Sequence, residues 1–311
     1  MKNQKAATVL ALLAVLLWST VATAFKLALT EFSPFQLIFV ATAVSLFFFM
    51  AVVLLSGKWQ AFTRISMKQL LQSAGQGLLN PFLYYLILFK AYSLNPAQVT
   101  QALNMVWPVT LALLSVPLLG QKLGLKNLLA ICFSFLGVVF ISSQGGIDGF
   151  VRTNTLGAGL ALGSSLIWAL YWLFSTRDTR DRLVVLSWNF LFGLLFLLVY
   201  SFFEDGAFAF PLSGLPFAAA VYVGLFELGI TYVIWIYALY KSENNAVTGN
   251  FIFLCPFISL VFIHFVLHES IYPTTFVGLS FILLGIFSQQ LRWRSLQRFV
   301  AKGGHKQTTQ R

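Results

Sequence analysis

Long apolar segments alternate with short polar connectors along almost the whole chain. A membrane-spanning helix needs about 20 largely apolar residues. Ten segments meet or approach that length: 6–29, 34–55, 70–92, 96–119, 125–143, 155–176, 182–203, 215–240, 244–267 and 273–290. Barrel strands would alternate polar and apolar residues, whereas the segment 186–200 does not alternate and is apolar apart from Ser187 and Asn189. The pattern therefore predicts an all-α polytopic membrane protein with ten transmembrane helices.

The first apolar segment follows Lys2 and Lys5, as the apolar core of a signal peptide would. It continues without a break to about Leu29, and no small-residue cleavage site ends it. That length suits a spanning helix better than a signal peptide. We therefore interpret it as an uncleaved first helix.

Composition supports a chain that lies in lipid. Of its 311 residues, 59% are hydrophobic and 9% are charged, against about 25% charged residues in soluble domains. The net charge of +11 comes from basic residues between the apolar segments, with no stripe or motif that would indicate a nucleic-acid partner.

The basic residues are strongly biased to one side of the predicted membrane. If the N-terminal side is called inside, 17 of the 20 Lys and Arg residues fall there: Lys2, Lys5, Lys58, Arg64, Lys68, Lys122, Lys126, Arg177, Arg180, Arg182, Lys241, Arg292, Arg294, Arg298, Lys302, Lys306 and Arg311. The outer connectors carry the acidic residues Glu31, Asp148, Glu204, Asp205 and Glu269. Because cytoplasmic loops are enriched in Lys and Arg, both termini are predicted to be cytoplasmic, with 291–311 as a basic cytoplasmic tail.

The two halves of the chain resemble each other. A shift of 148 residues aligns the third to fifth segments with the eighth to tenth without a gap, pairing Pro108 with Pro256 and Gly137 with Gly285. A shift of 150 pairs Trp18 with Trp168. Because each repeat, 6–143 and 155–290, holds five helices, the second would be inverted in the membrane. Inverted repeats are typical of secondary transporters.

These features resemble one known family. The sequence Leu-Leu-Trp-Ser-Thr at 16–20, the mid-helix prolines and the turn at 267–270 are similar to those of EamA-type permeases of the drug/metabolite transporter superfamily. Gln121 departs from the Glu usual in the equivalent turn. The resemblance implies a bacterial inner-membrane transporter of amino acids, amines, carboxylates or related metabolites. It also implies a cavity lined by helices 1, 3, 4, 6, 8 and 9, and a monomer or homodimer.

Glu227 is the leading candidate for a transport residue. It is the only acidic residue deep inside a predicted span, where an unpaired charge costs about 3 kcal/mol or more. We expect it to bind a substrate amine, a coupling proton, or each in turn. The alternative is a structural ion pair with Lys26 or Lys90.

Further polar and aromatic residues lie near the same predicted depth, where transporters place their substrates. The candidate binding residues are Trp18, Ser19, Asn80, Tyr84, Gln101, Asn104, Trp168 and Tyr232. Tyr85, Trp107 and Trp235 are further aromatic candidates. Pro81, Pro108 and Pro256 are candidate hinges, or simple kinks. Gln101 and Asn104, three residues apart, share one helix face and would serve a substrate or a helix–helix seam. The GxxxG spacing of Gly159 and Gly163 predicts a close helix contact.

No nucleotide, metal or catalytic motif was found, so we expect no cofactor, no metal site and no enzyme activity. The predicted function is a secondary transporter of an amino acid or amine that works by alternating access, with protons as a candidate coupling ion and lipid as its surroundings. Open alternatives are an uncoupled facilitator and a transporter of a carboxylate, sugar or nucleotide-sugar with Lys26 or Lys90 as counter-charge. A membrane enzyme would have to use His264, His268 and Glu269.

Overall fold

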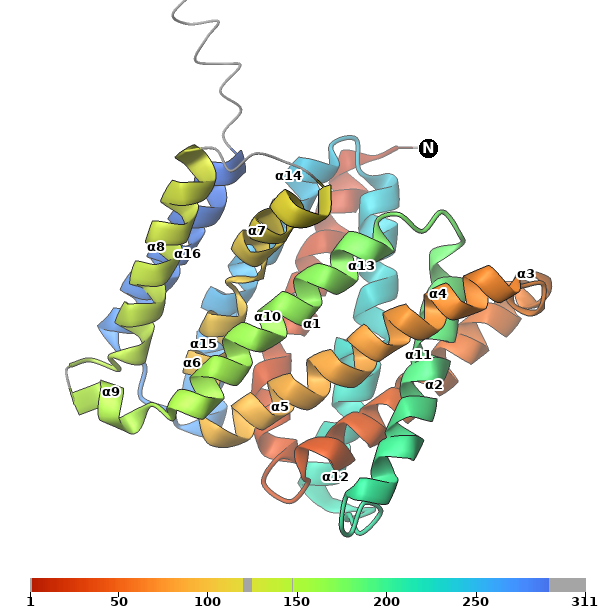
Figure 1. Cartoon of the computed structure of the whole chain (residues 1–311), viewed down its shortest axis with the longest axis horizontal. Coiled ribbons are helices and arrows are strands. Elements are labelled where there is room, and N and C mark those ends of the chain that lie inside the picture. The colour runs from red at the N-terminus through yellow and green to blue at the C-terminus, as the bar shows by residue number, and fades with distance from the viewer. Residues whose placement is uncertain (1, 120–124, 147, 291–311) are drawn as a thin grey trace, which may run out of the picture.

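The protein is a bundle of helices (Figure 1). The structure is a computed structural model that describes residues 2–119, 125–146 and 148–290 and contains no strand among them. Six helical stretches are long and apolar enough to cross a membrane: Gln4–Ala28, Pro34–Leu55, Thr155–Ser175, Arg182–Phe203, Gly214–Lys241 and Val247–Leu267. Two shorter apolar helices are Ile131–Ser142 and Pro273–Phe287. The count of ten spans stays a prediction, and the predicted tail, 291–311, lies outside the described residues.

Six of the predicted spans are continuous helices: α1 (Gln4–Ala28), α2 (Pro34–Leu55), α8 (Leu125–Ser142), α10 (Thr155–Ser175), α11 (Arg182–Tyr200) and α16 (Pro273–Gln290). Polar side chains begin several of them by accepting hydrogen bonds from free backbone N–H groups. Ser33 and Gln36 form a capping box at α2, and Asp181 caps α11. Connectors contain the short helices α3 (Trp59–Thr63), α9 (Asp148–Arg152) and η2 (Ser201–Phe203).

The other four predicted spans are interrupted. The third consists of α4 (Met67–Gly77), the π-helical turn η1 (Leu78–Leu83) and α5 (Tyr84–Leu94), and the fourth of α6 (Ala97–Asn104) and α7 (Trp107–Leu119). The eighth consists of α12 (Gly214–Tyr222), the π-helical turn η3 (Val223–Glu227) and α13 (Ile230–Lys241). The ninth consists of α14 (Asn245–Gly249), the 3₁₀ turn η4 (Asn250–Leu254) and α15 (Cys255–Leu267).

The predicted hinge prolines lie at or beside three of these breaks. Pro81 lies inside η1, beside Asn80, whose backbone has the non-helical angles φ −144° and ψ 120°. A proline interrupts the helix here because it has no N–H to donate and its ring crowds the preceding turn. Pro108 and Pro256 are the second residues of α7 and α15, where a missing N–H costs nothing. A hinge motion at these positions stays a prediction.

Two glycine contacts bring helices unusually close. α8 and α16 lie side by side at one edge of the bundle (Figure 1), and a Cβ atom on Gly137 would lie 2.6 Å from the carbonyl oxygen of Gly278. A Cβ atom on Gly77 would lie 2.5 Å from the carbonyl oxygen of Asn189 in α11. The predicted close contact at Gly159 and Gly163 is wrong, since a Cβ atom at either position would have no atom of another described helix within 4 Å.

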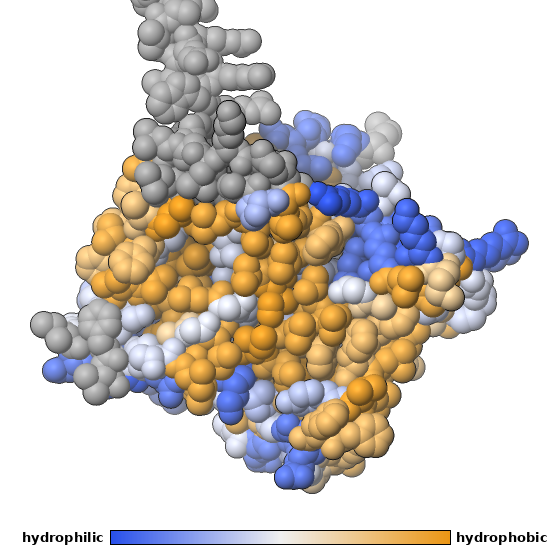
Figure 2. Space-filling model, viewed as in Figure 1, coloured by the Kyte–Doolittle hydropathy of each residue, from blue (hydrophilic) through white to orange (hydrophobic). Residues whose placement is uncertain are grey.

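The surface has the pattern of a multi-pass membrane protein. Figure 2 shows apolar side chains across the middle of the visible face, over α5, α7 and α10, with hydrophilic groups gathered toward its ends. Leu113, Leu118, Leu156 and Leu166 are among the exposed apolar residues. Such a band would be unfavourable in water but suits the hydrocarbon of a bilayer.

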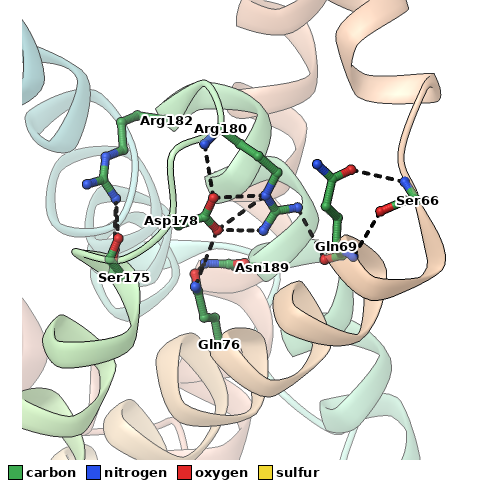
Figure 3. Close-up of polar contacts among 8 residues, drawn as sticks. All are labelled: Ser66, Gln69, Gln76, Ser175, Asp178, Arg180, Arg182 and Asn189. Carbon is green, nitrogen blue, oxygen red and sulfur yellow. Dashed lines mark hydrogen bonds and ion pairs between the residues drawn. The ribbon is translucent and has the colours of Figure 1, made fainter.

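Two ion pairs form within the described residues, both near the connector between α10 and α11, and both have an N–O distance of 2.6 Å. Arg180 holds Asp178 through both carboxylate oxygens and also donates to the carbonyl oxygen of Gln69 in α4 (Figure 3). The side chains of Arg180 and Asp178 are 12% and 2% exposed, whereas those of Lys58 and Asp181 are 35% and 39% exposed. The two pairs therefore have the same length but very different surroundings.

We predict that R180M lowers the free energy of unfolding by about 3–5 kcal/mol, because it leaves the buried Asp178 carboxylate unpaired. The matched variant K58M breaks the exposed pair and should change it by about 0–1 kcal/mol. Thermal unfolding of both purified variants in detergent measures the difference. Equal losses in the two variants would contradict this assignment.

The loss in R180M should also depend on pH. Burial of Asp178 disfavours its ionised form, but the hydrogen bonds and charge of Arg180 outweigh burial and hold the pKa of this carboxyl below its ordinary value. A lowered pKa contributes stability above the unfolded-state pKa and loses it as the pH falls through the folded-state pKa. The stability difference between wild type and R180M should therefore shrink on acidification.

Candidate functional site

The backbone break at Glu227 opens the helix and is stabilised from neighbouring helices. The N–H of Leu228 donates to the carbonyl oxygen of Val223 five residues back, at 3.2 Å, as in a π-helical turn. Ser45 of α2 donates to the carbonyl oxygen of Gly224 at 2.6 Å, and Trp18 of α1 donates to that of Glu227 at 3.3 Å. These side chains satisfy carbonyl groups that lipid could not.

The carboxyl group of Glu227 has one hydrogen-bond partner. The hydroxyl of Tyr85, a fully buried residue of α5, donates to Oε1 at 2.8 Å. Oε2 is buried and has no partner within the described part of the chain. The carboxyl group is therefore half satisfied, which is unusual for a buried acid.

Among the described residues, Glu227 forms no ion pair with Lys26 or Lys90, the alternative that the sequence left open. Lys26 donates to the carbonyl oxygens of Tyr92 and Asn95 at the end of α5, at 2.9 and 3.2 Å. Lys90 is exposed. Neither ion pair of the described residues contains Glu227.

Aromatic rings connect the predicted residues around this carboxyl group. The ring centres of Tyr84 and Tyr85 are 4.6 Å apart, and Trp168 of α10 stacks on Tyr84 at 4.6 Å. On the other side, Tyr232 of α13 forms a polar interaction with Tyr85, and Trp18 meets Tyr232 edge to face at 5.8 Å. The structure thus brings together four predicted aromatic residues through one that was not among the leading candidates, Tyr85.

Asn104 joins the same group, whereas its neighbour on the predicted helix face does not. Tyr84 donates to Oδ1 of Asn104 at 3.2 Å, and the amide of Asn104 donates to Ser164 at 2.9 Å. Gln101 instead donates to Ser259 of α15 at 2.8 Å. The two side chains of α6 therefore have separate surroundings.

Gln101 and Ser19 belong to a polar seam between α1, α6 and α15. Ser259 receives the hydrogen bond from Gln101 and donates to the carbonyl oxygen of Ser19. The hydroxyl of Ser19 donates to Val15 at 2.7 Å and to Cys255 at 3.2 Å. Of the two roles predicted for Gln101, the structure presents the helix–helix seam.

Asn80 is fully buried in η1. Neither polar atom of its amide forms a hydrogen bond of normal geometry, although the hydroxyl of Tyr171 interacts with it. Pro81 packs beside Gly193 of α11, where a Cβ atom would lie 2.5 Å from the proline ring. Both residues therefore shape the contact between the third span and α11.

The contacts of Tyr85, Ser164 and Ser259 were not predicted from the sequence. Tyr85 was only one of several aromatic candidates. The sequence could not rank it higher, because the break at Pro81 changes which face of α5 points inward. As a whole the group offers one carboxyl hydrogen-bonded to a tyrosine whose ring belongs to a series of packed aromatic side chains, which suits a proton or an organic cation. No group of three or more His, Cys, Asp or Glu residues that could hold a metal occurs in the described ranges.

Comparison with known proteins identifies relatives of the chain. The model of the EamA-like transporter family matches residues 5–143 and 155–288. An uncharacterized transporter of Archaeoglobus fulgidus is 26% identical over 293 residues, which cover 92% of this chain and 97% of the relative. The uncharacterized transporter YvbV of Bacillus subtilis is 25% identical over 211 residues, 67% of this chain and 68% of the relative.

A solved structure described only as "Crystal structure of protein" has a similar fold. Its TM-score is 0.63 at 20% sequence identity, over 94% of this chain and 99% of that one. This likeness concerns the fold alone.

We predict that S259A lowers the free energy of unfolding by about 1–3 kcal/mol, because it leaves the buried amide of Gln101 without an acceptor. S134A is the matched control, since the hydroxyl of Ser134 is equally buried but has no hydrogen-bond partner. Its removal should leave stability nearly unchanged. Thermal unfolding in detergent compares the two, and an equal effect would argue against the seam.

Proposed function

Because this chain belongs to the EamA-like transporter family, we propose that it moves a small metabolite with a positively charged amine, such as an amino acid, across the membrane by alternating access. Family membership and the apolar helices make it a multi-pass membrane transporter. The substrate class, the mechanism and the role of Glu227 are the proposal. The observation that carries it is the buried, half-satisfied carboxyl group of Glu227.

A carboxylate at this depth needs a positive partner. Ionised and unpaired among apolar helices it would cost about 3 kcal/mol or more, and the single hydrogen bond from Tyr85 offsets part of that. Lys26 is engaged by backbone carbonyls and Lys90 is exposed. A proton or the ammonium group of a substrate would supply the missing charge, and the two would compete for the same oxygen atoms.

The aromatic surroundings favour an ammonium group over an anion or a neutral sugar. Ring faces attract cations by about 0.5–2 kcal/mol each when desolvated. Tyr84, Tyr85 and Tyr232 interact electrostatically with Glu227, and two tryptophans pack on their rings. A carboxylate or nucleotide-sugar would meet the charge of Glu227, and no lysine among the described residues pairs with that charge.

The interrupted helices support alternating access. In transporters with repeats, discontinuous helices flank the substrate site, and one repeat rocks against the other. The interrupted spans here are the third, fourth, eighth and ninth of the predicted ten, which are equivalent positions in the proposed inverted repeats 6–143 and 155–290. We place both termini in the cytoplasm and the protein in a bacterial inner membrane, on the bias of its basic residues.

A ligand panel tests the substrate class. Purified protein in detergent is heated with amino acids, amines, their N-acetyl derivatives, carboxylates, sugars and nucleotide-sugars. Compounds with a free ammonium group should raise the unfolding temperature, since a ligand at 100 times its Kd stabilises by about 2.7 kcal/mol. N-acetyl derivatives, which lack the charge, should not.

The variant E227Q then tests the role of the carboxyl group. It should lose both the thermal shift and the uptake that a pH gradient drives into proteoliposomes, whereas E31Q, an exposed acid in a connector, should behave as wild type. Full gradient-driven flux in E227Q would refute the proposal. Stabilisation by carboxylates or sugars alone would move the substrate to another class.

A further inference from the structure

A column of buried polar side chains starts at the connector between α10 and α11 (Figure 3). Its mouth is a surface cavity of about 220 Å³ lined by Ala61, Arg64, Ile65, Gln69, Arg180, Asp181 and Val184. Arg180 holds Asp178 beneath this cavity. The amide of Gln76 donates to Asp178 at 3.4 Å, and the amide of Asn189 donates to Gln76 at 3.0 Å. These groups lead inward from the surface between α4 and α11.

Tyrosine hydroxyls continue the column to the candidate site. The hydroxyl of Tyr171 in α10 interacts with Asn189, and Tyr171 interacts electrostatically with Tyr232. Tyr232 interacts with Tyr85, and Tyr85 donates to Glu227. Polar groups therefore line a route from the buried carboxyl to one face of the molecule, with no hydrogen bond between Tyr171 and Tyr232 among the described residues.

Several atoms along this column are buried without a hydrogen-bond partner. They are Oδ1 of Asn189, both polar atoms of the Asn80 amide and the hydroxyl of Ser73. Ser73 and Gln76 are three residues apart on α4 and so share one face. Buried polar groups of this kind bind ordered water, typically through two to four hydrogen bonds. The amide part of the column is thus suited to hold water.

We infer that this column is the path by which Glu227 exchanges its proton with the cytoplasm. The inference rests on the proposed function, in which Glu227 takes up a proton and a substrate in turn. A purely structural seam between helices would need neither a surface cavity at one end nor a carboxyl group at the other. Here both ends carry a group that protons can reach or leave.

The transfer is balanced along the column. The carboxyl proton of Glu227 passes to the oxygen of Tyr85 as Tyr85 gives its own proton to Tyr232, and water carries the proton that Tyr232 releases to Tyr171. Amide groups do not relay protons readily, so water held by Asn189 and Gln76 carries the proton past them. Glu227 loses one proton and becomes a carboxylate, and one proton reaches the cytoplasm.

Asp178 forms the mouth of this path as an ionised group. Arg180 holds the pKa of the Asp178 carboxyl below its ordinary value despite burial, so Asp178 stays ionised and paired with Arg180 at neutral pH. At the inner end, the titratable residues that interact electrostatically with Glu227 are Tyr84, Tyr85, Tyr92, Tyr232 and Cys255. Polar groups of neighbouring helices contact the same turn: Trp18 of α1 donates to the carbonyl oxygen of Glu227, and Ser45 of α2 donates to that of Gly224. Tyr222 of α12 forms a hydrogen bond with Thr20 of α1.

Proton uptake without any substrate tests the path. Membrane vesicles with the cytoplasmic face outward are adsorbed on a solid-supported electrode, and a step in external pH produces a transient current from protons that reach Glu227. N189L and Y171F should slow this current about tenfold, the factor that corresponds to losing one hydrogen bond. Y200F, which alters a tyrosine of α11 packed on Phe35 and Phe82, should keep the wild-type rate.

The outcomes separate the path from the proposed function. In vesicles of opposite orientation, N189L and Y171F should respond to an external pH step as wild type does. If E227Q abolishes the current but N189L and Y171F leave its rate unchanged, the path is wrong and the function stands. If E227Q keeps the wild-type current, the proton role of Glu227 fails. Should N189L not fold, Y171F, which removes only a hydroxyl, decides the result.

Discussion

A carboxyl group held among apolar helices without a cation sets the conditions for the rest of this molecule. Ionised, it needs a positive partner; protonated, it needs a route for the proton to leave. Among the described residues, Glu227 has one tyrosine hydroxyl as a hydrogen-bond partner and no ion pair with a lysine or arginine. The positive charge is therefore left for a proton or a ligand to supply, and a group in that position responds to both.

The interrupted helices make this arrangement possible. A regular helix through residue 227 would use its own carbonyl groups, but the π-helical turn frees them, and Ser45 and Trp18 satisfy them from α2 and α1. The break at Asn80 and Pro81 similarly turns α5 so that Tyr84 and Tyr85 reach the same region. Close approach at Gly77 and Gly193 then fixes the interrupted third span against α11. Weakened backbone hydrogen bonding is thus confined to places where side chains compensate for it.

The sequence alone predicted the helical membrane fold and the family, and it singled out Glu227 as a candidate, because length, hydropathy and a lone acid within an apolar span are local signals. Trp18, Tyr84, Asn104, Trp168 and Tyr232 were expected near one depth and are linked by side-chain contacts that run through Tyr85, whereas their role in binding stays a prediction. The sequence could not show that Gln101 and Asn80 have different contacts from these residues, since helix breaks change which face each half-helix presents. The polar column of Gln76, Asn189 and Tyr171 was not predictable, because its members come from three different spans and no spacing rule relates them.

The most direct measurement is labelling of Glu227 by dicyclohexylcarbodiimide, an apolar reagent that reacts with protonated carboxyl groups away from water, mapped by mass spectrometry. One enclosed carboxyl that binds either a proton or an ammonium group should be labelled at Glu227, and an amine that stabilises the protein should prevent labelling as its concentration rises. Labelling that continues unchanged under saturating amine, or no labelling at Glu227 at any pH at which the protein remains folded, would contradict this description of the site.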